Sequence, residues 1–212
     1  MRGLKIASMN YSKLKPQIYS YLGYHGVGAS EETDALILDC LGELEKVQTF
    51  RYRYQAFEEI PAFLAKEPYL EFLKGASGVV LSVMTLGTEV DRLLKLYART
   101  NAARGVVLDA SASAYLEYRS DEYEKTIGGL SYRFCPGYGG SEVGDIRYIF
   151  ELLHPEKIGM TLLENNYMLP SKSMAGVLGI GGQNTKNCGS CILLAHCNYR
   201  KEGTRCYGSE KK

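Results

Sequence analysis

The sequence predicts an α+β fold, in which a mixed, largely antiparallel sheet has helices along its sides. Segments with helical periodicity and segments with strand-like composition both occur in the 212 residues. They do not alternate in the regular strand–helix–strand order that is typical of a parallel sheet. Hydrophobic residues make up 45% of the chain, which is enough for a buried core.

The first predicted elements are a helix over residues 29–47 and a strand over residues 49–57. Ser30 is a suitable N-cap, and Ile37, Leu41 and Leu44 fall on one face of the helix. The stretch TFRYRYQAF then alternates aromatic and charged residues, as a half-buried strand does.

A second strand and helix follow over residues 78–100. GVVLSVMTL is apolar and rich in β-branched residues, which favours a buried strand. GTEVDRLLKLYART continues directly, with Thr88 and Asp91 spaced as a capping box and an apolar stripe along one face.

The remaining elements are helices over residues 102–125 and 143–157 and two more strands. Ala110, Ala112 and Ala114 in the first helix would let another element approach closely, and Pro155 ends the second helix. The strands are IGMTLLEN and MAGVLGIGG, joined by the loop NYMLPSKS. The core is expected to end near residue 180, which divides the chain into a body (1–180) and a cysteine-rich tail (181–212).

Charge and hydropathy narrow the possible functions. The net charge is +1, with both signs interleaved, so we expect no nucleic-acid binding. No apolar run approaches the ~20 residues that a membrane span needs, and the first residues do not form a signal peptide. We therefore expect a cytoplasmic protein with reduced thiols and no membrane partner.

The stretch YRFCPGYGGSE, residues 132–142, is the strongest candidate for a binding site. Arg133 offers a planar fork that suits a carboxylate, and glycine lets backbone groups approach a ligand closely. Tyr138 adds an aromatic face and a hydroxyl. From chemistry alone, a ligand site and an ordinary loop remain equally good interpretations.

RFCPGY resembles the R-x-x-P-G-Y loop of the activation domain of cobalamin-dependent methionine synthase. The stretch IFELLHPEKIGMTLLENNYMLPSKSMAGVLGIG is similar to the helix, strand and proline loop that follow in that family. TLGTEVDRL and the helix around Glu117 also resemble it. The resemblance covers about residues 30–180 and is closest to versions of this domain that form a separate chain.

The resemblance implies an S-adenosylmethionine site in the turn. Arg133 would bind the carboxylate of the methyl donor, and the turn formed by Phe134, Cys135, Pro136 and Gly137 would contact it closely, with the backbone at Cys135 meeting the adenine. Tyr138 would lie between the donor and the corrin ring and take part in the chemistry. Glu117 and Glu124 are candidates for the carboxylates that bind the ligand in this family, whose later aromatic contact has no counterpart here.

The implied function is reductive methylation of inactive cob(II)alamin on a separate corrinoid methyltransferase such as methionine synthase. The sequence has no D-x-H-x-x-G cobalamin motif, so cobalamin would arrive on that partner protein. A flavodoxin- or ferredoxin-type protein is a possible electron donor. The chain would thus act in a reactivation system for methionine biosynthesis.

The tail contains a cysteine cluster with the spacing C-x2-C-x5-C-x8-C. Its members are Cys188, Cys191, Cys197 and Cys206, and His196 could replace one of them. Four cysteines so close together in a reduced compartment favour a metal site, either zinc or an iron–sulfur cluster. An iron–sulfur cluster suits reactivation better because that reaction needs an electron. Free thiols or disulfides remain alternatives.

Two functions of other classes stay open. One is a binding or scaffold module that keeps the fold without methyl transfer. The other is a small redox protein that uses only the cysteine cluster.

Overall fold

The computed structural model describes residues 11–24 and 28–181. The chain order of its elements is α1 (Tyr11–Tyr21), α2 (Glu31–Val47), β1 (Arg51–Phe57), η1 (Ala62–Leu64), α3 (Tyr69–Phe72), β2 (Gly78–Thr85), α4 (Thr88–Thr100), α5 (Ala102–Ile127), η2 (Val143–Asp145), α6 (Ile146–Leu153), η3 (Pro155–Ile158), β3 (Thr161–Leu162), β4 (Met168–Leu169) and β5 (Ser173–Ile180).

The main sheet has the strand order β1-β2-β5 and is antiparallel throughout its described part. In the central pair, Gly78 lies opposite Ile180 and Thr85 lies opposite Ser173. The chain from residue 129 to 134 runs along the other side of β5 and forms isolated bridges at Leu130 and Phe134. The predicted α+β class and the antiparallel sheet are confirmed.

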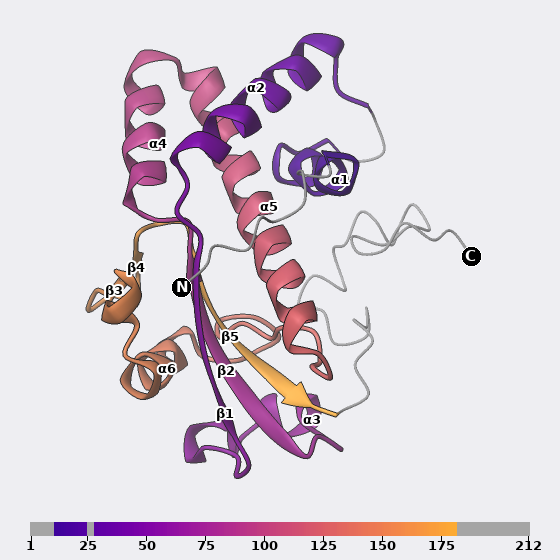
Figure 1. Cartoon of the computed structure of the whole chain (residues 1–212), viewed down its shortest axis with the longest axis vertical. Helices are drawn as coiled ribbons and strands as arrows, with labels where there is room; N and C mark the ends of the chain where they lie inside the picture. The colour runs from indigo at the N-terminus through magenta and orange to yellow at the C-terminus, as the bar shows by residue number, and fades with distance from the viewer. Residues whose placement is uncertain (1–10, 25–27, 182–212) are drawn as a thin grey trace.

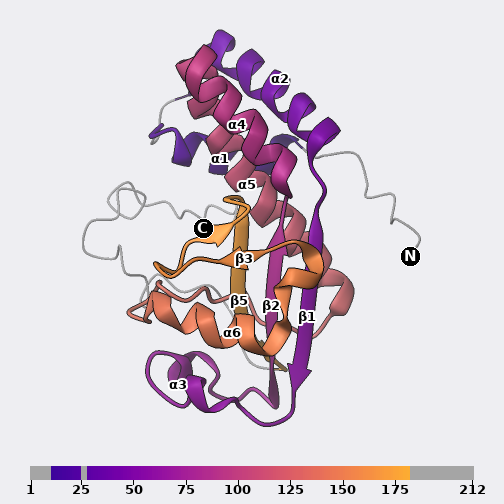
Figure 2. The same cartoon turned by 90° about the vertical axis from the view of Figure 1, so that its left-hand side faces the viewer.

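Helices cover both faces of this sheet. Helices α1, α2 and α4 gather at one end of the molecule, and the long α5 descends from this group along one face (Figure 1). Figure 2 shows α6 and the β3-β4 hairpin in front of the opposite face, with α5 behind it. The two faces of the sheet are therefore covered by different elements. Successive side chains of β2 point alternately to one face and to the other.

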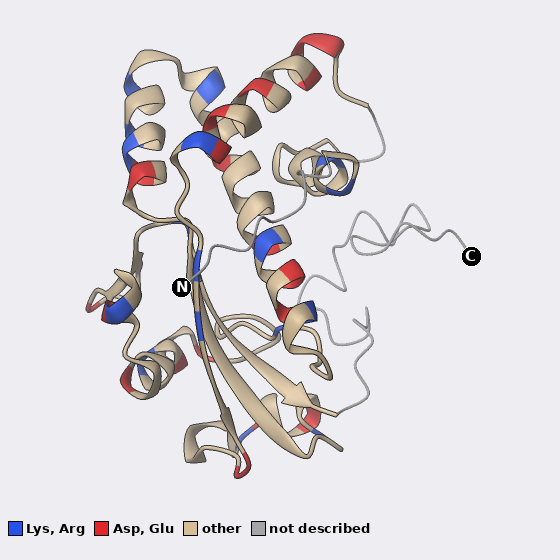
Figure 3. Cartoon of the chain, viewed as in Figure 1, with Lys and Arg blue, Asp and Glu red and all other residues tan. Residues whose placement is uncertain are grey.

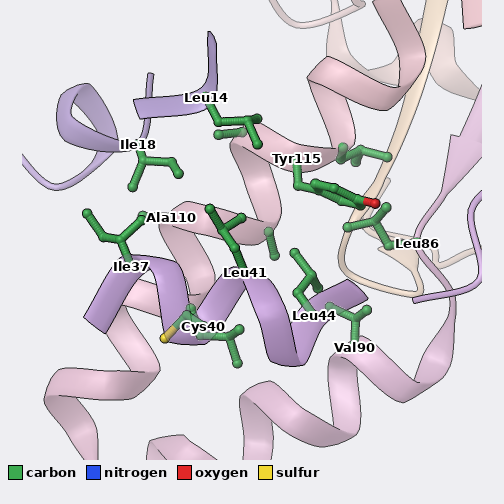
Figure 4. Close-up of a cluster of buried hydrophobic side chains, with 14 of the residues drawn as sticks. Leu14, Ile18, Ile37, Cys40, Leu41, Leu44, Leu86, Val90, Ala110 and Tyr115 are labelled. Atoms are coloured by element: carbon green, nitrogen blue, oxygen red, sulfur yellow. The ribbon is translucent and has the colours of Figure 1, made fainter. Parts of the chain in front are cut away.

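The first hydrophobic core lies among α1, α2, α4 and α5. Figure 4 shows Leu14 and Ile18 of α1 facing Ile37 and Leu41 of α2. Ala110, Ala112 and Ala114 are buried in this cluster, as their small size predicted. The second core lies under the other face of the sheet, where Val79, Leu81 and Val83 of β2 pack with residues of α6 and α3.

Local sequence signals explain several of these elements. Ser30 caps α2, because its side chain accepts a hydrogen bond from the backbone N–H of Thr33 at 3.2 Å. Ile37, Leu41 and Leu44 are buried, and Pro155 follows the end of α6 at Leu153. These predictions are confirmed.

The capping box predicted for Thr88 and Asp91 is wrong. Gly87 is the N-cap residue of α4, without a side-chain capping bond. Asp91 instead accepts hydrogen bonds from the backbone N–H of Ser171 at 2.8 Å and from its hydroxyl at 2.6 Å. The carboxylate thus connects α4 to the loop before β5, 80 residues away in the sequence.

The predicted strand in IGMTLLEN is largely wrong. Only Thr161 and Leu162 are extended, and they pair with Met168 and Leu169 in a separate hairpin. The loop predicted over residues 166–173 therefore contains β4. The predicted strand that follows is confirmed as β5.

No helix in the described ranges is both long and apolar enough to cross a membrane. The body described here reaches Gly181, one residue past the predicted end of the core. The predicted tail lies almost wholly outside the described residues, and its division from the body stays a prediction.

Candidate functional site

The predicted turn is a tight reversal at the edge of the sheet. The N–H of Tyr138 donates to the carbonyl of Cys135 at 3.2 Å, and Pro136 and Gly137 occupy the two central positions. Gly137 has a φ of 91°, which a type II turn requires at this position and which favours glycine. Proline and glycine are thus explained by the backbone geometry alone.

Strand-like alternation sends neighbouring side chains to opposite faces of the sheet. The backbone of Phe134 pairs with Val177 through two hydrogen bonds of 2.8 Å, so this segment continues the sheet beyond β5. The Phe134 ring packs in the second core, with its centroid 5.4 Å from that of Tyr69 and 5.0 Å from that of Phe72. Arg133 points to the other face of the sheet, toward α5. The predicted contact between Phe134 and a ligand stays a prediction.

Arg133 is buried and already has two acidic partners on α5. Its side chain is 7% exposed and lies 2.5 Å from a carboxylate oxygen of Glu124 and 2.9 Å from one of Asp121. Glu124 is also buried and accepts a 3.0 Å hydrogen bond from the hydroxyl of Tyr52 on β1. The sequence nominated Glu124 as a ligand carboxylate, and the structure places it against the arginine.

Arg133 and its acidic partners shift each other's pKa toward the charged form. Burial alone would lower the pKa of Arg133, but the carboxylates of Glu124 and Asp121 raise it above its ordinary value. Burial raises the pKa of Glu124, while Arg133 and the Tyr52 hydroxyl oppose that shift. The ion pair lies on the face of the sheet that α5 covers, and removing either partner would leave the other charge buried without its partner.

Gly176 on β5 makes the space for Arg133. A Cβ atom at this position would lie 2.3 Å from Cγ of Arg133 and 2.6 Å from its Cδ. Such contacts are impossible, so the arginine stem crosses the sheet where a side chain is missing. The sequence did not indicate a role for Gly176, because Arg133, the residue that requires a glycine there, lies 43 residues away.

Glu117 lies about one helical turn before Asp121 on α5 and is held by α1. Gln17 donates to one of its carboxylate oxygens and the hydroxyl of Tyr21 donates to the other. Burial raises the pKa of Tyr21, and Glu117 and Tyr138 add to the rise, so Tyr138 lies in the electrostatic range of this pair. Glu117 and the turn thus belong to one neighbourhood.

Cys135 belongs to the same neighbourhood. Burial raises the pKa of its thiol to about 11, Arg133 lowers it in part, and Glu117 and Glu124 raise it further. The thiol is therefore protonated at neutral pH. Its pKa is thus influenced by every charged residue that the resemblance nominated.

Tyr138 is the exposed residue of the turn. It is 66% exposed, the largest value among the exposed large hydrophobic residues of the described chain. Figure 3 shows both signs of charge along the part of α5 that approaches this region, without a block of one sign. The Tyr138 ring is thus open to solvent.

The described ranges contain no cluster of three or more histidine, cysteine or acidic side chains that could hold a metal ion. Cys188, Cys191, Cys197, Cys206 and His196 lie outside the described residues, so the predicted tail site stays a prediction. His154, the one histidine in the described ranges, has a left-handed backbone at the end of α6 and lies 3.6 Å from Glu156.

Sequence reasoning missed the residues that hold the turn from behind. They are Tyr69 and Asp145, both buried and hydrogen-bonded to each other, and Ser141, which bonds within the turn. Gln17 and Tyr21 were missed as well, because no helix had been predicted at α1. The sequence offered one signal for these residues, which is the position of Asp145 directly before the apolar segment IRYIFELL.

Comparisons with known proteins agree with this geometry at the level of the fold. No protein-family model matches the chain, and no curated protein matches it significantly. Among solved structures, the chain is similar to the MetH reactivation domain bound to AdoHcy, at 14% sequence identity and a TM-score of 0.56. The match covers 93% of this chain and 85% of that domain, so the chain has the fold of a methionine synthase reactivation domain over most of its length.

Proposed function

We propose that the protein binds S-adenosylmethionine at the 133–138 turn and supports reductive methylation of cob(II)alamin on a separate corrinoid methyltransferase. The observation that carries this proposal is the hydrogen-bonded Cys135–Tyr138 turn, which follows the buried side chain of Arg133 in the chain and leaves Tyr138 exposed. The fold likeness supports it, because the solved domain carries AdoHcy, which is the demethylated form of the proposed donor.

The chain's own residues would hold and orient the donor. A guanidinium has five N–H donors, and the described ion pairs of Arg133 occupy only one N–H on each terminal nitrogen. The donor's carboxylate would take remaining N–H groups, while Glu124 keeps the arginine in place. The backbone of Cys135 and Gly137 would contact the adenosyl part closely, since glycine leaves the approach open.

Bound S-adenosylmethionine would supply the methyl group, and cobalt would belong to the partner. Tyr138 would face the partner's corrin, because it is the side chain of the turn that solvent reaches most freely. Fixing donor and acceptor in one geometry removes much of the entropic barrier to their reaction. We further propose that the cysteine cluster of the tail binds an iron–sulfur cluster or zinc, and that a flavodoxin- or ferredoxin-type protein supplies the electron.

Calorimetry with S-adenosylmethionine is the first test. Arg133→Ala would leave Glu124 buried without its partner, so Arg133→Lys is the cleaner variant: it keeps the charge and removes the planar fork. We expect Arg133→Lys to weaken donor binding by about 2–4 kcal/mol, the range for loss of charge-assisted hydrogen bonds. Arg92→Lys is the matched control, since Arg92 is 74% exposed and pairs only with the nearby Glu89 in the described contacts.

A second test uses the partner. The cobalamin-binding domain of methionine synthase, in the cobalt(II) state, is mixed with wild-type protein or Tyr138→Phe, and the visible spectrum is recorded. We expect the wild-type protein to change the spectrum and Tyr138→Phe to change it less. An unchanged spectrum with both proteins would reject docking at this turn.

A scaffold function is the second candidate, and the ion pairs of Arg133 favour it. Glu124 and Asp121 already pair with the arginine, as they would in a module that binds no donor. Wild-type protein that binds no S-adenosylmethionine would support the scaffold function. If such protein also contains iron and sulfide after anaerobic purification, the result would instead support a small redox protein. Zinc without sulfide would exclude electron transfer by the tail.

A further inference from the structure

Tyr69 connects the two ends of the loop that contains the candidate site. It is the first residue of α3, and its side chain is completely buried. Its ring packs edge-on against Phe134, on the segment that enters the turn. Its hydroxyl donates to Asp145 at 2.9 Å, on the segment that leaves the turn, and the backbone N–H of Asp145 donates to the carbonyl of Glu142 at 3.2 Å.

Asp145 is a buried acceptor for the Tyr69 hydroxyl. The residue is 1% exposed, and a carboxylate so deeply buried needs a partner for each oxygen. Lys66 donates to one oxygen at 2.9 Å and Tyr69 donates to the other at 2.9 Å. Burial raises the pKa of Tyr69, and Asp145 raises it further, so the hydroxyl remains a donor at neutral pH.

Ser141 carries the constraint into the turn itself. Its hydroxyl accepts a hydrogen bond from the N–H of Gly137 at 3.0 Å and donates to the carbonyl of Tyr138 at 2.7 Å. Its own N–H donates to the same carbonyl at 3.0 Å. The orientation of the peptide groups around Tyr138 is therefore fixed by Ser141, which precedes Glu142, the residue whose carbonyl accepts from Asp145.

We propose that Tyr69 is a positioning residue whose hydroxyl, through Asp145 and the segment 141–145 that Asp145 anchors, fixes the turn and the direction in which Tyr138 is presented. This inference deepens the proposed function, on which its effect on donor binding rests. The simple alternative is that Tyr69 only fills the core. Tyr69→Phe separates the two, because phenylalanine keeps the ring contacts and removes the hydroxyl.

The natural sequence has no tryptophan, which makes a direct measurement possible. Tyr138→Trp places one tryptophan at the tip of the turn, and its time-resolved fluorescence anisotropy reports nanosecond motion there. In this background we expect Tyr69→Phe to increase the amplitude of local motion. Tyr97→Phe is the matched control, since its hydroxyl also donates to a carboxylate, Glu43, at 2.8 Å, but from α4 to α2.

Donor binding is measured separately, with Tyr138 intact. We expect Tyr69→Phe to weaken S-adenosylmethionine binding about tenfold, since a hydrogen bond to a buried charge is lost. Ser141→Ala should act in the same direction, and Ser141→Thr, which keeps a hydroxyl, should restore binding. If Tyr69→Phe does not fold, the two Ser141 variants decide the question.

Unchanged anisotropy and affinity in Tyr69→Phe and Ser141→Ala would overturn the inference. If wild-type protein binds no donor, the proposed function fails, but the anisotropy comparison still tests the positioning role. An equal increase in motion in the Tyr97→Phe control would also overturn it, because the effect would then be general loosening of the fold.

Discussion

Gly176→Ala should strongly destabilise the protein, although alanine adds only one methyl group. The new Cβ would lie 2.3 Å and 2.6 Å from two middle carbons of the Arg133 side chain, and 3.3 Å from the hydroxyl of Ser82. Arg133 cannot move easily, because ion pairs hold its guanidinium and the neighbouring Phe134 is bonded to β5. The substitution therefore shifts β5 or breaks the ion pair.

Both outcomes have known magnitudes. Overpacking a close-packed site costs about 1–3 kcal/mol, and removing one partner of a buried ion pair costs about 3–5 kcal/mol. We expect a loss of about 3 kcal/mol in the free energy of unfolding, since the molecule can take the less costly response. Urea denaturation followed by circular dichroism measures it.

Gly42→Ala is the matched control. Gly42 lies inside α2, and a Cβ there would meet nothing within 4 Å. Alanine should stabilise this helix by about 0.5–1 kcal/mol. A loss below about 1 kcal/mol in Gly176→Ala would refute the steric argument. In the Arg133→Ala background, Gly176→Ala should cost little, because the clashing atoms are gone.

Three further predictions concern charge. Glu117→Gln should reduce the preference for S-adenosylmethionine over S-adenosylhomocysteine, whose sulfur is uncharged, by about fiftyfold in calorimetry. It removes one negative charge at an assumed separation of about 7 Å from the sulfonium, which corresponds to about 2.4 kcal/mol at an effective dielectric constant of about 20; an unchanged preference would place the sulfonium elsewhere. Hydrogen bonds from Lys15 and Tyr19 lower the pKa of Asp34, so its stabilising effect is present above the ordinary value of 3.8 and is lost as the pH falls below it; Asp34→Asn should flatten the acid limb of stability in urea titrations, and an equally steep limb would contradict this. Burial raises the pKa of Cys135 from 9.0 to about 11, so alkylation at pH 8, followed by peptide mass spectrometry, should be about a hundredfold slower than for a free thiol; alkylation at the rate of a free thiol would show that the loop opens.

Elements with strong local signals could be predicted from the sequence. Helix α2 has a cap and an apolar stripe, and β2 is a continuous apolar run bounded by turns. Helix α1 has neither signal: only Leu14 and Ile18 are buried, and Pro16 lies inside it. Its stability comes from contacts with α2 and α5, such as those of Asp34, which a local pattern does not reveal.

The candidate site divides in the same way. The turn at Pro136 and Gly137 is a local property of its residues, and the structure forms it at the expected position. The partners of Arg133 lie on another element, and Asp91 prefers Ser171, 80 residues away, to the capping role that its position in the helix suggests. Non-local hydrogen bonds of this kind cannot be derived from spacing along one helix.

The pairing of β5 also has a consequence for the order of events during synthesis. Helix α5 and the 133–138 segment are made before β5, but Phe134 is fixed by Val177, and the stem of Arg133 lies over Gly176. Contacts that close loops of about 40 residues form slowly compared with local helices. Until Ile180 has left the ribosome, the nascent chain therefore lacks the bonds to β5 that fix the segment before the turn. Binding of the proposed donor would begin only when β5 joins the sheet.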